Sequence, residues 1–211
     1  MIVGLAQRAL VSLTIVPSAR EWYDVAGITL ATTSMAGLVA AGTGFVDPIG
    51  DFDPPTGSLA HRILRPLSAL VVPALVEETI WRGAFLSPVV VSSSSSSLSW
   101  HGWAGGVLIL HVLFHPIAAR TFWPRGQHVF DDARFLLLAT IVLGGATLSF
   151  AASGGSAWAA AVTHGIPVAL WRDFWGGEAK LLGAKPRNPI DARNTHDHNE
   201  EDHDDSVDKR R

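Results

Sequence analysis

The sequence predicts an all-α protein, a bundle of helices that cross a membrane, and three observations lead to this prediction. Hydrophobic residues make up 48% of the 211-residue chain and charged residues only 17%, whereas globular domains usually carry about 25% charged residues. Several apolar runs approach or reach the roughly 20 residues that a helix needs to cross a bilayer. Strands are disfavoured, because an open sheet edge would stay unpaired in lipid.

The first elements are an apolar N-terminal segment and one long uncharged run. Residues 1–24 carry an early basic residue, Arg8, and match neither a clean signal peptide nor a full span. Residues 25–46 contain no charge and are rich in Gly, Ala, Ser and Thr, which allow helices to pack closely in lipid. A polar, proline-rich loop follows at residues 47–66.

Four further apolar runs follow this loop, at residues 67–91, 103–123, 135–152 and 158–175. Six consecutive serines at residues 92–97 indicate a flexible connector. We therefore expect a polytopic bundle of five transmembrane helices, or six if the N-terminal segment also crosses. Residues 25–175 would form a single transmembrane domain in an integral, multi-pass membrane protein.

The C-terminal segment, residues 176–211, is highly polar, unlike the apolar runs before it. It holds nine acidic residues, seven basic residues and three histidines, with few large apolar side chains. Such a segment buries too little surface to offset its ordering entropy, so we expect a disordered tail. Its basic residues favour a cytoplasmic or stromal C-terminus. The net charge of −3 gives no sign of nucleic-acid binding, and the absence of cysteine excludes disulfides and thiolate sites.

Ionisable side chains inside the apolar runs are the strongest indication of function. An ionisable residue at the centre of a bilayer costs about 2.5–3.5 kcal/mol even on the milder scales. Residues placed there at such a cost pair with one another or line a functional cavity. Six such residues lie inside the runs and away from their ends: Glu77, Glu78, Arg82, His111, His115 and His164.

The spacing of these residues separates their roles on a helix. Glu78 and Arg82 are four apart and share a face, whereas Glu77 points about 100° away and is free to meet another group. A carboxylate beside an imidazole can activate water for hydrolysis, and a second imidazole can stabilise the resulting oxyanion. Two imidazoles and a carboxylate also match the ligands of a catalytic zinc ion. A structural ion pair and packed histidines remain the alternative interpretation.

The order of these groups resembles a known family of membrane proteases. Glu77 to Arg82 reads EETIWR, similar to the E-E-x-x-x-R motif of the CPBP family, which comprises CAAX proteases and bacteriocin-processing proteases and is also called Abi. His111 to Pro116 reads HVLFHP, where the family has F-x-x-x-H, and His164 to Val168 reads HGIPV, where it has H-x-x-x-N. The resemblance covers residues 67–175 and is greatest to the cyanobacterial and plastid-type members.

The resemblance implies an intramembrane endopeptidase, with a role for each matching residue. Glu77 would be the general base, His115 would help to hold the attacking water, and His164 would help to form the oxyanion site. Glu78 and Arg82 would shape and charge the site. The implied substrate is a peptide or a prenylated protein, met within membrane lipid. Zinc is left open, with Glu77, His115 and His164 as its ligands if it is bound.

Two departures from the family pattern keep other functions open. His111 stands where a Phe is usual, and it either adds a ligand or replaces the ring as packing. Val168 stands where some members have Asn, and losing one oxyanion donor typically lowers the rate by about 10²–10³. Pro167 is expected to kink its helix. The alternative is therefore a non-proteolytic membrane scaffold or assembly factor; a proton- or metal-coupled transporter is disfavoured, because no paired half-repeats are seen.

Overall fold

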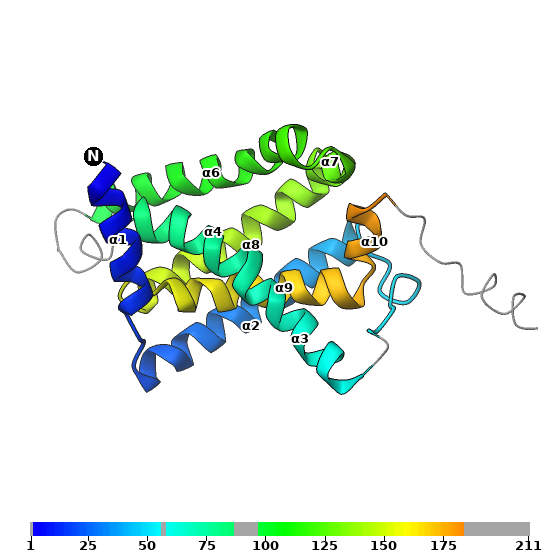
Figure 1. Ribbon diagram of the computed structural model, residues 1–211, viewed down its shortest axis with the longest axis horizontal. Helices are drawn as coiled ribbons and strands as arrows, with labels where there is room; N and C mark the ends of the chain where they lie inside the picture. The colour runs from blue at the N-terminus through cyan, green and yellow to red at the C-terminus, as the bar shows by residue number, and fades with distance from the viewer. Residues whose placement is uncertain (1, 56–57, 87–96, 184–211) are drawn as a thin grey trace, which may run out of the picture.

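The computed structural model describes residues 2–55, 58–86 and 97–183, and within these ranges it contains helices and no strand. The predicted all-α class is thus confirmed for this part of the chain (Figure 1). Most of the serine run and residues 184–211 of the tail lie outside it. The helical segments are, in order, α1 (Ile2–Thr14), α2 (Ala19–Gly42), α3 (Leu59–Ala69), η1 (Leu70–Leu75), α4 (Val76–Glu78), η2 (Thr79–Ala84), α6 (Ser97–Phe122), η3 (Pro124–Gly126), α7 (Gln127–Phe130), α8 (Ala133–Ala152), α9 (Ala157–Phe174) and α10 (Gly177–Leu181).

Three of the described helices are long and apolar enough to cross a membrane. They are α2, the Trp100–Phe122 part of α6, and α8, with mean hydropathies of 1.5, 1.5 and 2.1. Large apolar side chains project outward from all three, including Leu38, Leu110 and Leu148. Soluble monomers rarely expose contiguous apolar surface of this kind. The predicted count of five or six spans is not confirmed, because length and composition support only these three.

Helix α2 turns its small residues inward and its large ones outward. Its buried side chains are Val25, Thr29, Thr32, Ala36 and Ala40, spaced three or four residues apart on one face. This face packs against α8 and α9, and Thr32 lies directly against Gly145. Small residues at such contacts let helix backbones approach closely, as is usual for helices in lipid. The helix begins earlier than predicted, because Ser18 and Glu21 form a capping box.

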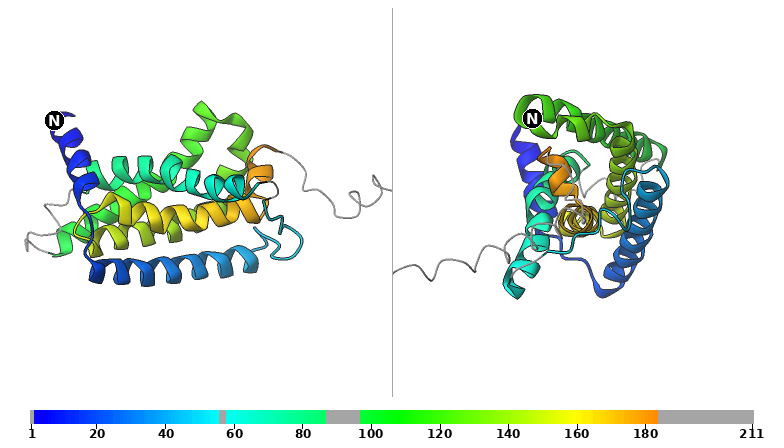
Figure 2. Two further views of the ribbon diagram at one scale, coloured as in Figure 1. Left: turned by 60° about the horizontal axis from the view of Figure 1, so that its bottom comes forward. Right: turned by 90° about the vertical axis from the view of Figure 1, so that its right-hand side faces the viewer.

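Helix α9 lies at the centre of the bundle. Seen end-on in the right-hand view of Figure 2, it is surrounded by the other long helices. It contacts α2, α3, α8 and η1, and most of its small residues are buried. The helix continues through Pro167, so the kink predicted there does not interrupt it. His164 is therefore carried by the most enclosed helix of the bundle.

The segment predicted as a span at residues 67–91 is not one regular helix. As far as it is described, it runs through the end of α3, the kinked η1, the short α4 and the π-helical η2. Val72 has an extended backbone conformation, with φ −133° and ψ 114°, because the following Pro73 disfavours the helical region for its predecessor. π-helical turns are rare and frequently occur at functional sites. Here the π-helical η2 follows directly after Glu77 and Glu78.

The start of the tail is ordered, contrary to the prediction of disorder from residue 176. Gly176 turns the chain with φ 67°, and residues 177–181 form α10. Lys180 fixes this helix by donating to the Phe45 carbonyl at 2.7 Å and to the Asp51 carboxylate at 2.8 Å. Leu181 packs into the cluster around Val129. These contacts supply the apolar burial and ion pairing that composition alone did not indicate.

Helix α9 approaches η1 closely at Gly165, so we expect Gly165→Ala to destabilise the protein. A Cβ at this position would lie 2.6 Å from Leu70 Cδ2 and 3.1 Å from Leu70 Cα. Overpacking of this kind costs about 1–3 kcal/mol. Thermal unfolding in detergent measures the loss. Gly37→Ala on α2 is the matched control, since its Cβ meets open space; an equal response of the two variants would contradict the packing described.

Candidate functional site

All six ionisable residues singled out in the sequence lie on neighbouring segments of the bundle. Glu77 and Glu78 are on α4 and Arg82 is on η2. His111 and His115 are on α6, and His164 is on α9. His111 and His164 both lie near the middle of their helices. These two histidines therefore sit well away from the ends of α6 and α9.

Arg82 and Glu78 form the predicted ion pair at the core of the site. Both residues have an exposed fraction of 0%, and Arg82 Nη1 donates to Glu78 Oε1 at 2.9 Å. The same nitrogen lies 2.9 Å from Oε2, but the direction of its N–H favours Oε1. Glu78 Oε2 has no hydrogen-bond partner among the described residues. Removing one partner of such a pair would leave an uncompensated charge in the interior.

The remaining donors of Arg82 connect three segments. Nη1 also lies 2.8 Å from His111 Nδ1. Nη2 donates to the Leu143 carbonyl at 2.7 Å and to Thr147 Oγ1 at 3.2 Å, and Nε points to the same hydroxyl. Arg82 thus links η2 to α6 and α8 by hydrogen bonds, and these bonds fix the plane of its guanidinium group.

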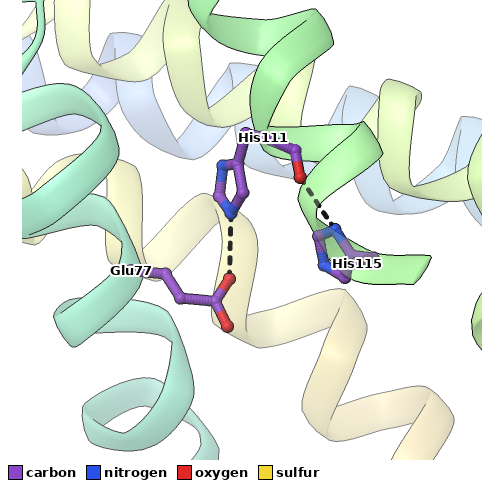
Figure 3. Close-up of side chains that lie close together, drawn as sticks. All are labelled: Glu77, His111 and His115. Atoms are coloured by element: carbon purple, nitrogen blue, oxygen red, sulfur yellow. Dashed lines mark hydrogen bonds and ion pairs between the residues drawn. The ribbon is translucent and has the colours of Figure 1, made fainter. Parts of the chain in front are cut away.

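Glu77 lies in a different environment from its neighbour. Its side chain is 30% exposed, whereas that of Glu78 is 0% exposed. Glu77 Oε2 lies 3.1 Å from His111 Nε2, as Figure 3 shows. One carboxylate is therefore enclosed and paired with an arginine, while the other is accessible and held by an imidazole.

His115 and His164 each use Nδ1 to bind another part of the protein. His115 Nδ1 lies 3.0 Å from the His111 carbonyl, and His164 Nδ1 lies 2.8 Å from Glu78 Oε1. A carbonyl and an ionised carboxylate only accept, so in both rings Nδ1 is the donor. The Nε2 atom of each ring is left for another partner, such as a water molecule or a substrate.

The set of residues that could hold a metal differs from the predicted one. Ligand atoms of Glu77, His111 and His115 all lie within 4.8 Å of one another, and Figure 3 shows these three side chains. His164, the third residue of the predicted set, is not part of this group. It instead bonds Glu78. The place of His164 in the group is taken by His111, the residue that departs from the family motif.

The site is also supported by side chains that the sequence analysis did not single out. Trp81 stacks on the His111 ring at 4.6 Å between centroids and 15° between planes. Thr163, one residue before His164, shares hydrogen bonds of 2.7 Å with the hydroxyls of Thr29 and Ser149. Thr147 and Ser149 could have been found from the sequence as hydroxyl residues inside an apolar run.

No protein-family model, curated protein or solved structure matches this chain.

Proposed function

We propose that the protein is a multi-pass membrane endopeptidase that hydrolyses a peptide bond with water activated by Glu77 and His115. The observation that carries this proposal is the contrast between the two adjacent carboxylates. Glu78 is enclosed by Arg82 and His164, while Glu77 is accessible and lies beside two imidazoles. The resemblance of the three motifs to the CPBP family supports the same assignment.

In the proposed reaction, a water molecule binds between the Glu77 carboxylate and Nε2 of His115. Glu77 removes a proton as the water oxygen attacks the carbonyl carbon of the substrate, which is general base catalysis. The protonated Glu77 then delivers that proton to the leaving amine as the C–N bond breaks. His164 is the candidate for stabilising the oxyanion when its Nε2 carries a proton. Arg82 and Glu78 hold His164 and His111 in place.

The proposed substrate is a peptide segment that reaches the site within the membrane, and the resemblance suggests the C-terminus of a prenylated protein. Three helices of the bundle are suited to a bilayer, and His111 and His164 lie near the middle of their helices, which supports a site reached from within lipid. The Glu77 side chain is 30% exposed, whereas that of Glu78 is 0% exposed. A substrate presented by lipid would meet this carboxylate before it met Glu78.

A non-proteolytic scaffold is the second candidate, and Val168 favours it. Val168 lies one helical turn after His164 on α9, where some family members carry the amide that binds the oxyanion. A valine side chain donates no hydrogen bond. On this alternative, the buried polar cluster fixes the helices relative to one another, and the exposed helix faces bind partners.

The two candidates are distinguished by a cleavage assay on the purified full chain in lipid nanodiscs. The substrates are a quenched farnesylated CAAX peptide, the same peptide without the farnesyl group, and peptides from membrane-protein C-termini. We expect cleavage at one bond, identified by product mass and preferred in the farnesylated peptide. A chelator arm shows whether a metal takes part. Absence of cleavage across the whole set would contradict the protease and favour the scaffold.

A further inference from the structure

Arg82 determines which nitrogen of His111 carries a proton. Its Nη1 lies 2.8 Å from His111 Nδ1, and a guanidinium only donates hydrogen bonds and stays protonated in proteins. Nδ1 must therefore accept, with its lone pair directed at Arg82. The ring is held in this orientation, because the His111 side chain is 1% exposed and Trp81 is stacked on it.

The proton of a neutral His111 ring is consequently on Nε2, which faces Glu77. A neutral imidazole has one N–H, so a ring that accepts at Nδ1 donates at Nε2. Nε2 lies 3.1 Å from Glu77 Oε2, which accepts. A directed chain of hydrogen bonds thus runs from Arg82 through His111 to Glu77, and it begins at a guanidinium fixed by Glu78, Leu143 and Thr147.

The same geometry conflicts with a metal ion bound by His111. A neutral histidine that binds a metal through Nε2 carries its proton on Nδ1, and that N–H normally donates to a carboxylate, a carbonyl or water. Here an N–H on Nδ1 would face the N–H of Arg82, and two donors repel each other. The group of Glu77, His111 and His115 therefore has the spacing of a metal site but lacks a third ligand in the required form.

We propose that His111 is a positioning residue, which transmits the fixed orientation of Arg82 to the Glu77 carboxylate and prevents this three-residue group from binding a metal. The part of this inference that concerns catalysis rests on the proposed function. Since His111 occupies the position of a family Phe, its polar role belongs to this chain. This positioning role differs from the two that the sequence left open for His111, which were a metal ligand and a packed ring.

The protonation of His111 can be measured without any assay of activity. Long-range ¹H–¹⁵N correlation spectra of the full chain, labelled with [¹⁵N]histidine in nanodiscs, distinguish the two neutral tautomers and the imidazolium. His111→Phe identifies the signals of this residue by their loss. We expect an unprotonated Nδ1, a protonated Nε2 and no change on adding Zn²⁺. An Nδ1–H tautomer, an imidazolium, or a zinc-induced shift of the His111 signals would overturn the inference.

The positioning role is tested by two substitutions at the same residue. His111→Phe keeps a ring against Trp81 but removes the hydrogen bond to Glu77, whereas His111→Gln keeps an N–H that can reach it. Loss of an orienting partner of this kind typically costs about 10–100-fold. We expect His111→Phe to lower kcat by that factor with KM within about twofold of the parent, and His111→Gln to restore much of the loss.

These results separate the inference from the proposed function. A parent protein that cleaves nothing would defeat the proposed function, yet the spectra would still decide the hydrogen-bond chain. If the parent cleaves and His111→Phe retains its kcat, the positioning role is wrong even with the expected tautomer. Equal losses in His111→Phe and His111→Gln would also contradict it, because the loss would then not depend on the donated hydrogen bond.

Discussion

Arg82→Met is expected to cost about 3–5 kcal/mol of stability, the range found when one partner of a buried ion pair is removed. The substitution leaves the Glu78 carboxylate in an interior where its exposed fraction is 0%. It also removes the donors to Leu143, Thr147 and His111. For a chain of this length the loss lowers Tm by on the order of 10 °C. Thermal unfolding of the full chain in one detergent provides the measurement.

A surface arginine provides the matched control for this prediction. Arg134 also pairs with a carboxylate, that of Asp132, but its side chain is 47% exposed. An exposed pair contributes only about 0–1 kcal/mol, so Arg134→Met should leave Tm nearly unchanged. The double variant Glu78→Gln with Arg82→Met should lose less than Arg82→Met alone, because no buried charge remains unpaired. Comparable losses of Tm in Arg82→Met and Arg134→Met would contradict the buried hydrogen-bond network described for Arg82.

The sequence was most informative where residues lie within about one helical turn of each other. Glu78 and Arg82 are four residues apart, and their pairing follows from the helical repeat. The separation of Glu77 from Glu78 follows from the same repeat, and the structure gives the two carboxylates different partners. The all-helical class followed from long apolar runs, which leave few alternatives in lipid.

The partners of His111 could not be predicted, because they come from two segments, α4 and η2, that are separate from its own helix. Its ring lies among Glu77 on α4, Arg82 on η2 and Trp81 beside it. Periodicity places a residue on a face of its own helix, but it does not say which helix packs against that face. The sequence therefore left His111 as either a ligand or a packed ring.

The break in the apolar run at residues 67–91 could have been predicted from Pro73, but the length of the run concealed it. Pro73 removes a backbone donor and constrains Val72. A run of 25 residues can therefore be long enough for a span and still divide into shorter pieces. The ordering of α10 had a weaker signal, since it depends on Lys180 reaching Phe45 and Asp51, more than a hundred residues away.

Glu77→Gln is expected to abolish most of the proposed peptidase activity while leaving the fold intact. An amide of the same shape can still accept from His111 Nε2, so the side chain keeps its place beside the imidazole. It cannot remove a proton from water, and loss of a general base lowers rates by about 10²–10⁴. Since Glu77 is partly exposed and has no arginine partner among the described residues, Tm should change little.

The most direct measurement is the rate of peptide cleavage by the parent, Glu77→Gln and Glu178→Gln in the same lipid nanodiscs. Glu178 is the control, because it is an exposed glutamate on α10 that pairs with Arg65. We predict that Glu178→Gln retains the rate of the parent and that Glu77→Gln loses at least about 10² of it, with both variants folded. Cleavage by Glu77→Gln at the rate of the parent would contradict the assignment of Glu77 as the general base.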